Sequence, residues 1–316
     1  MKERERIKTA GVPEVDFSDA REMRPYLREP DAMYVGAPGK HGYLKLVFER
    51  DPWGKSILRE IDRRVPLIAQ QALYFDEEMP GMPCLYILSS GGPNVDGDRY
   101  EQDITVRKDT EAWISTGAAT KLAEMRYNYS GMRQDIKVEA GGYLEFMPEP
   151  IYPCRHTRFI SDTRLCVDET ATCFYSEIYM GGRKYYKEGE LFEFDILSVC
   201  SHGERPDGRQ LFREKFVIDP HVSNLRGLGI MGRYDVFANV LVLTPREHAD
   251  AIYAATEVFI RPEMAVGITH LPNGAGLLLK VLGMEAGPVK KMVREFCSRV
   301  RMEVKGKPVP AEFPWR

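Results

Sequence analysis

The chain has 316 residues, 43% hydrophobic and 29% charged, a composition typical of a globular protein with a sizeable core. Its 44 Lys and Arg against 47 Asp and Glu give a net charge of −3, which excludes a generally basic nucleic-acid-binding protein. The 27 Gly and 21 Pro are a modest excess that indicates many turns.

Residues 1–40 differ in texture from the rest of the chain. They are charged, lack a sustained hydrophobic period and contain four prolines, so we expect a partly flexible N-terminal extension. Charges also stand where the apolar core of a secretory signal would lie. The longest apolar runs, such as 237–243, are far shorter than the about 18 residues of a membrane span. We therefore expect a cytoplasmic protein without membrane association.

From residue 43 onward the chain consists of short segments rich in β-branched and aromatic residues, several of them alternating with period two. Turn residues separate these segments, and no helical pattern intervenes, which predicts an all-β body within a single domain over 41–316. The predicted strands lie at 43–50, 55–61, 67–75, 84–89, 102–106, 111–116, 134–140, 143–147, 158–167, 172–180, 190–199, 209–218 and 234–244.

Two helices are predicted near the C-terminus. Thr244, followed by Pro245 and by Glu247 three positions on, resembles a capping box and predicts a helix from Pro245 to about Val258. A buried strand is expected at 276–283. A second helix follows Gly287, because apolar residues recur there three or four apart as far as residue 304, and Gly306 provides a stop.

Two motifs with a possible binding role are weak on inspection. Residues 227–232 match GxGxxG, but a strand-like segment follows them where a dinucleotide site requires a helix N-terminus, so we interpret them as a glycine turn. Residues 94–98, which include Asp96 and Asp98, have the glycine too early for a calcium-binding EF-hand loop. An Asx-rich turn is the better interpretation.

The six cysteines are scattered without a CxxC pair, which favours reduced thiols over a disulfide framework. Two Cys-x-His pairs, Cys154 with His156 and Cys200 with His202, are candidate metal ligands. On a strand, positions i and i+2 point to the same side, so each pair would present a thiolate and an imidazole to one soft metal ion.

Four motifs in order resemble the family of the urease accessory protein UreD, also called UreH. The first is GGPNVDGD within 83–106, with its turn residues Gly91, Gly92 and Gly97. The others are AATK within 115–126, LEF within 141–153, and SEI with Gly182 and Arg183 in 176–183; the tail 276–310 resembles the family's C-terminal strand and helix.

This resemblance implies a mainly β fold of stacked, β-helix-like sheets with two helices near the C-terminus. It also implies a non-enzymatic urease maturation factor that binds the urease apoprotein with the helical accessory protein UreF. That assembly would recruit the GTPase UreG and support nickel insertion. No tightly bound cofactor and no nucleic-acid or membrane partner is expected; nickel would be in transit.

Matching the family positions gives the residues that the resemblance implies for a nickel path. A relayed divalent cation needs weak, exchangeable ligands along a hydrated route, which oxygen donors provide. The candidates are Asp98, Thr120, Lys121, Glu145, Glu177 and Glu214. Each carboxylate has an alternative structural role, either in holding its own turn or in a buried pair with Arg or Lys.

Two other functions remain open from the sequence. One is a nickel storage or sensing protein that uses the Cys-x-His pairs. The other is an enzyme, such as a hydrolase, with an acidic site around Asp96, Asp98 and Glu177, although no nucleophile or general base stands at an informative spacing.

Overall fold

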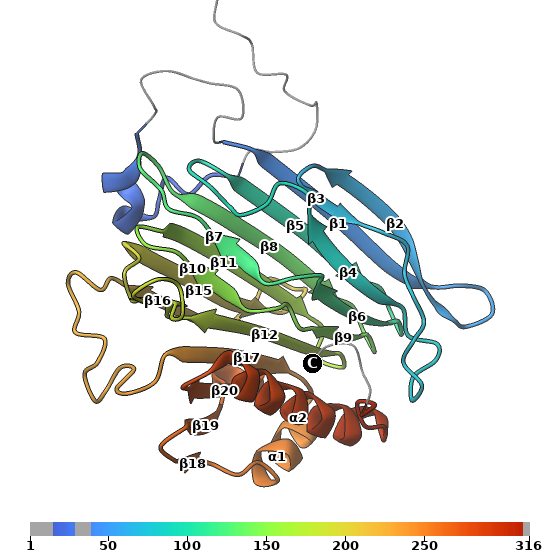
Figure 1. The fold of residues 1–316 in the computed structure, drawn as a ribbon. Helices are drawn as coiled ribbons and strands as arrows, with labels where there is room; N and C mark the ends of the chain where they lie inside the picture. Colours follow the sequence, from blue (N-terminus) through green and yellow to red (C-terminus); the bar gives the residue numbers. More distant parts are fainter. Residues whose placement is uncertain (1–14, 29–38, 312–316) are drawn as a thin grey trace, which may run out of the picture.

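The computed structural model describes residues 15–28 and 39–311, and in them two large β-sheets lie face to face (Figure 1). Sheet A has seven strands, in the spatial order β16 (Gln210–Ile218), β15 (Ile196–Glu204), β11 (Arg158–Val167), β8 (Ser130–Val138), β5 (Arg99–Val106), β1 (His41–Arg50) and β2 (Ser56–Arg64).

Sheet B is longer. Its order is β18 (Phe259–Ile260), β19 (Met264–His270), β20 (Gly276–Gly283), β17 (Val236–Leu243), β12 (Thr172–Met180), β9 (Tyr143–Phe146), β6 (Glu111–Thr116), β4 (Cys84–Ser89) and β3 (Leu67–Ala69). The short strands β10 (Ile151–Pro153) and β7 (Thr120–Leu122) extend from β12, and β13 (Gly182–Arg183) pairs with β14 (Glu190–Leu191).

The chain alternates between the sheets as it progresses. Strands β5, β8, β11 and β15 are parallel neighbours in sheet A, and β4, β6, β9 and β12 are parallel neighbours in sheet B. Each circuit from one sheet to the other therefore stacks on the previous circuit, as in a β-helix. The predicted mainly β, stacked fold with helices near the C-terminus is confirmed.

The space between the sheets holds the first core. Leu46, Ile104 and Ile136 are side by side in register across sheet A, and they pack with residues such as Ile114 and Phe146 of sheet B. Because successive strand residues point to opposite faces, the period-two pattern of the sequence places alternate side chains in this layer.

Helices α1 (Arg246–Ala254) and α2 (Ala286–Lys305) cover the other face of sheet B (Figure 1). The predicted apolar stripe of α2, including Val289, Val293 and Phe296, packs there in a second core, and Gly306 ends the helix with a left-handed φ of +66°. The central strands β9, β12 and β17 of sheet B are thus buried on both faces. Among the described residues, no helix has the length and apolarity to cross a lipid bilayer.

Several predicted boundaries are wrong. Helix α1 ends at Ala254, and Thr244 does not cap it, because its hydroxyl lies 2.8 Å from the hydroxyl of Thr172 on the adjacent strand. The segment 67–75 forms only the three-residue β3 and an isolated bridge at Leu73, and 190–199 divides into β14 and β15. Residues 227–232 lie in turns that lead into β17, as the glycine-turn interpretation predicts.

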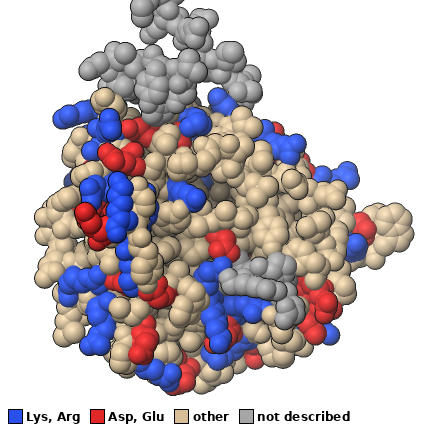
Figure 2. Space-filling model, in the orientation of Figure 1, with Lys and Arg blue, Asp and Glu red and all other residues tan. Residues whose placement is uncertain are grey.

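Residues 15–28 lie on the outer face of sheet A. They include a short 3₁₀ helix, η1 (Arg21–Tyr26), and Phe17 and Met23 pack there against Ile160 and Ile196. Residues 1–14 and 29–38 of the expected extension lie outside the described residues. Basic and acidic side chains are interspersed over the face shown in Figure 2, in keeping with the small net charge.

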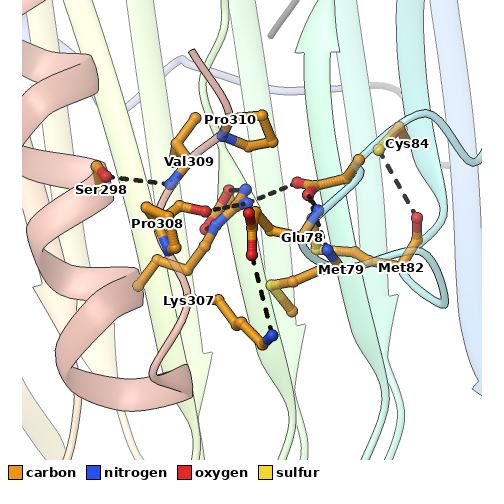
Figure 3. A network of polar contacts seen from close by, with 12 residues as sticks. Glu78, Met79, Met82, Cys84, Ser298, Lys307, Pro308, Val309 and Pro310 are labelled. Carbon is orange, nitrogen blue, oxygen red and sulfur yellow. Dashed lines mark hydrogen bonds and ion pairs between the residues drawn. The ribbon is translucent and has the colours of Figure 1, made fainter. Parts of the chain in front are cut away.

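A buried ion cluster fixes α2 to the sheet. The guanidinium of Arg301 donates from Nε and Nη2 to both carboxylate oxygens of Glu145 in β9, at 2.7 and 2.6 Å. Its Nη1 donates to Asp76 at 2.6 Å, and none of the three side chains is exposed to solvent. Figure 3 shows the chain after α2 joining the same region, with Val309 bonded to Ser298 and Lys307 paired with Glu78.

We expect Arg301→Ala to lower the free energy of unfolding by about 3–5 kcal/mol, because it leaves two buried carboxylates without their cation. Arg246→Ala is the matched control: its pair with Asp250 is highly exposed, so the loss should stay below about 1 kcal/mol. Urea denaturation measures both. A loss of unfolding free energy below about 1 kcal/mol for Arg301→Ala would contradict the conclusion that the buried ion cluster fixes α2 to the sheet.

Candidate functional site

A row of polar side chains crosses the interior between the two sheets. In sheet A it occupies one register line across five neighbouring strands and consists of Gln102, Gln134, Thr163, Ser201 and Glu214. In sheet B the matching line crosses β12, β17 and β20 and consists of Glu177, Asn239 and Lys280. We call these eight residues the polar row.

The two lines of the polar row face each other. Tyr175, two residues before Glu177 on β12, belongs to the inter-sheet core, and its hydroxyl donates to Gln134 of sheet A at 2.7 Å. Lys280 of sheet B forms an ion pair with Glu214 of sheet A, and about half of the Lys280 side chain is exposed. The row therefore begins at a solvent-accessible ion pair and continues inward to buried groups.

Glu177 is the carboxyl group at the centre of the row. It is 3% exposed, and the hydroxyls of Tyr175 and Tyr179 approach its Oε1 at 2.9 and 3.2 Å. Gln134 Oε1 also lies within hydrogen-bond distance of two hydroxyls, those of Tyr175 and of Thr163 at 3.1 Å. Gln134 in turn donates to Gln102 at 3.1 Å.

This network accepts both protonation states of Glu177. The single hydroxyl proton of Tyr175 serves either Gln134 or Glu177. When Glu177 is ionised, Tyr175 donates to Glu177 and Thr163 donates to Gln134. When Glu177 is protonated, it donates to the Tyr175 oxygen, and Tyr175 donates to Gln134. A proton can therefore leave or join Glu177 without leaving a buried acceptor unpaired.

Burial raises the pKa of Glu177 from 4.5 to about 7, because water is excluded from the ionised form. The two tyrosine hydroxyls oppose this rise by donating to the carboxylate, and the charge of Glu214 adds to it. The polar row thus holds a carboxyl group that exchanges its proton near neutral pH.

Asp98 lies elsewhere, in the turn that precedes β5. Its carboxylate is fully buried and accepts from the backbone N–H groups of Lys40 and Val95, at 2.9 and 3.0 Å, and from the Tyr100 hydroxyl at 3.1 Å. Asp96 similarly accepts from the backbone of Arg126, at 2.8 Å. Asp98 therefore holds its own turn, as the Asx-turn interpretation predicts, whereas Asp96 holds the separate loop at 126–128.

The remaining oxygen and lysine candidates are also apart from the row. Glu145 is on the helix-facing side of sheet B, where Arg301 binds it. Thr120 and Lys121 belong to the short strand β7, where Thr120 pairs with Ile151 and the Lys121 ammonium is exposed, 6.0 Å from the Tyr152 ring centre. Of the six candidates, the structure brings together only Glu177 and Glu214.

The family-motif glycines form tight turns. Gly92 and Gly97 have φ values of +72° and +76°, and a Cβ added at Gly91 would meet the Pro66 ring at 2.9 Å. At Gly182 an added Cβ would lie 1.8 Å from the carbonyl oxygen of Glu190. Arg183 then closes the β13–β14 turn through two hydrogen bonds to the Glu190 carboxylate, at 2.7 and 2.6 Å.

A surface cavity of about 540 Å³ lies beside Arg183, where the β13–β14 turn meets the first residues of α2. Its lining includes Met180, Tyr185 and Glu285 but no member of the polar row. This cavity and the polar row are therefore separate features.

The two Cys-x-His pairs differ in geometry. Cys154 and His156 stand in a turn, not on a strand; His156 has a φ of +55°, and its Nδ1 lies 3.1 Å from Asp195. The predicted common direction of these two side chains is wrong, because the turn replaces the two-residue strand repeat. Cys200 and His202 do lie on a strand, β15.

Sequence reasoning missed a third residue at the second pair. Asp162 is opposite Cys200 in register. The pKa of His202 is raised to about 9, mainly by the Asp162 carboxylate and next by the Cys200 thiol. Asp162 lies 38 positions before Cys200, and only the parallel pairing of β11 with β15 brings them together.

We expect Glu177→Gln to flatten the fall in stability with rising pH. The folded pKa of about 7 exceeds the ordinary 4.5, so the folded chain holds the proton more tightly and loses stability as pH rises through this interval, on the order of 3 kcal/mol in total. The variant lacks this group. Its unfolding free energy relative to wild type should therefore increase from pH 4.5 to pH 7; a constant difference would contradict the assigned environment.

Comparisons with known proteins find relatives over nearly the whole chain. The family model described as UreD urease accessory protein matches residues 40–316. Urease accessory protein UreD 2 of Brucella suis is 44% identical over 298 residues, which cover 94% of this chain and 98% of that protein. Urease accessory protein UreD of Yersinia pseudotuberculosis is 43% identical over 300 residues, which cover 94% and 93%. The chain belongs to the UreD family of urease accessory proteins.

Proposed function

We propose that this protein is a non-catalytic maturation factor that binds the urease apoprotein, together with UreF and UreG, and supports nickel insertion. Membership of the UreD family supports a role in urease maturation. The partners and the nickel step are the proposal, and the polar row is the observation that carries the nickel step.

The chemistry of the row suits a cation in transit. Carboxylate, amide and hydroxyl oxygens are hard, exchangeable donors, whereas a closed set of thiolates would retain the ion. In the proposal, the ion pair between Lys280 and Glu214 opens first. The free Glu214 carboxylate then receives the cation at the accessible end of the row. The ion then moves toward Glu177. When Glu177 loses its proton, the carboxylate that remains provides one compensating negative charge in the buried segment.

In the proposal, the other candidate residues have structural roles and do not bind the cation. Asp98 holds the turn before β5, and Glu145 fixes α2 through Arg301. Thr120 and Lys121 stand on an outer strand away from the row. The path therefore depends on Glu177 and Glu214.

We expect Glu177→Gln and Glu214→Gln to lower the nickel occupancy of urease in cells that co-express the urease subunits, UreF and UreG. The reason is that an amide provides an oxygen ligand but no negative charge. Nickel per urease active site, measured by elemental analysis, is the readout. Full nickel occupancy of urease with Glu177→Gln would show that this residue does not belong to the path.

Two controls separate the path from assembly. Glu60→Gln removes an exposed carboxylate at the edge of sheet A and should leave the occupancy unchanged. Affinity pull-down should recover the same partners with Glu177→Gln as with wild type. A loss of partners would assign the defect to assembly, and a failure of the wild-type chain to recover urease would overturn the proposed function itself.

A further inference from the structure

Three different metal-binding side chains meet on the outer face of sheet A. Cys200 and His202 are two residues apart on β15, and Asp162 of the parallel strand β11 is directly opposite Cys200. Their sulfur, nitrogen and oxygen donor atoms all lie within 4.8 Å of one another. In the described residues they are the one group of three or more such side chains that lie close enough to hold a metal ion.

Two of these donor atoms have no hydrogen-bond partner although they are buried. Asp162 Oδ1 and His202 Nδ1 both lack one, and the 3.5 Å that separates them is long for a hydrogen bond. Metal–ligand distances of about 2.0–2.3 Å in tetrahedral sites place neighbouring ligand atoms about 3.3–3.8 Å apart. The Asp162–His202 separation therefore has the span of two ligands on one ion.

The surrounding charges are already engaged. Arg133, beside Asp162 on β8, donates to the carbonyl of Asp16, and Arg164, beside His202 on β11, pairs with Asp135 and Glu204. On β16, Lys215 opposite Cys200 pairs with Glu22.

The last neighbour is Arg213, opposite His202 on β16. It lies close to the Cys200 thiol, which raises the pKa of the guanidinium.

Exposure leaves one side of the group accessible. The side chains of His202 and Asp162 are 21% and 31% exposed, while Cys200 is only 6% exposed. A cation would thus approach from solvent, between His202 and Asp162, and bind the buried Cys200 sulfur at the bottom of the site. Three protein ligands leave a fourth tetrahedral position for water or an incoming ligand.

We propose that Asp162, Cys200 and His202 form a surface site for one divalent transition-metal ion of the zinc type. The site is distinct from the polar row, because these side chains point outward from the strands whose alternate residues, Ser201 and Glu214, point inward. Its donors are sulfur, nitrogen and oxygen, which suit a borderline-soft ion, whereas the row provides oxygen donors.

Titration of the purified, reduced full-length chain with Co²⁺ tests the proposal, because a thiolate ligand gives a sulfur-to-cobalt charge-transfer band. We expect one equivalent to bind with this band in wild type, and Cys200→Ser to abolish the band. Cys154→Ser is the matched control, since that cysteine belongs to the pair in the turn, and it should keep the band. Absence of the band in wild type, or its persistence in Cys200→Ser, would overturn the site.

Zn²⁺ provides a second readout. Binding to the folded chain should raise the Tm of wild type. Loss of a residue that only hydrogen-bonds to a metal ligand typically lowers metal affinity by roughly tenfold or more. Because His202→Gln and Asp162→Asn change the ligands themselves, each should weaken Zn²⁺ binding by at least about tenfold. Circular dichroism of the metal-free variants verifies folding. Equal Zn²⁺ affinity in all of these folded variants would overturn the assignment.

Discussion

Burial of the central strands of sheet B on both faces is the constraint on which the rest of the structure depends. Sheet A covers one face and α2 covers the other, so nearly every side chain of β9 and β12 is buried. A polar group in these strands must find its partner within the protein, since a buried unpaired group costs about 1–3 kcal/mol. Glu145 and Glu177 meet this requirement on opposite faces, and they do so in different ways.

The difference between the two glutamates lies in the partner, not in the burial. Glu145 faces α2 and receives a guanidinium through two hydrogen bonds, so its charge is compensated and it fixes the helix. Glu177 faces sheet A and receives only hydroxyls, which do not offset the rise in its pKa that burial causes, so its proton becomes labile. One carboxylate therefore holds the fold together, and the other is available for chemistry.

The sequence predicts the layers of this fold better than the pairing of its polar groups. Period-two segments, glycine turns and the stripe of α2 follow local rules, and the structure bears them out. Thr244 failed as a cap because a hydroxyl on a neighbouring strand competed for it. Asp162 was missed because its proximity to Cys200 follows from the pairing of strands distant in the sequence, which no local pattern encodes.

The alternation along β15 explains why two polar sites with different chemistry lie so close together. Ser201 points into the oxygen-lined row, and its neighbours Cys200 and His202 point outward, with the hydrogen-bonded backbone of sheet A between them. An ion cannot cross that backbone, so the proposed surface site and the proposed path would not exchange ions directly. A thiolate and an imidazole favour retention of a soft ion, whereas a protonatable carboxylate among hydroxyl and amide oxygens favours release of an ion. In the two proposals, retention of an ion at the surface and transit of an ion through the interior are therefore separable properties of one strand.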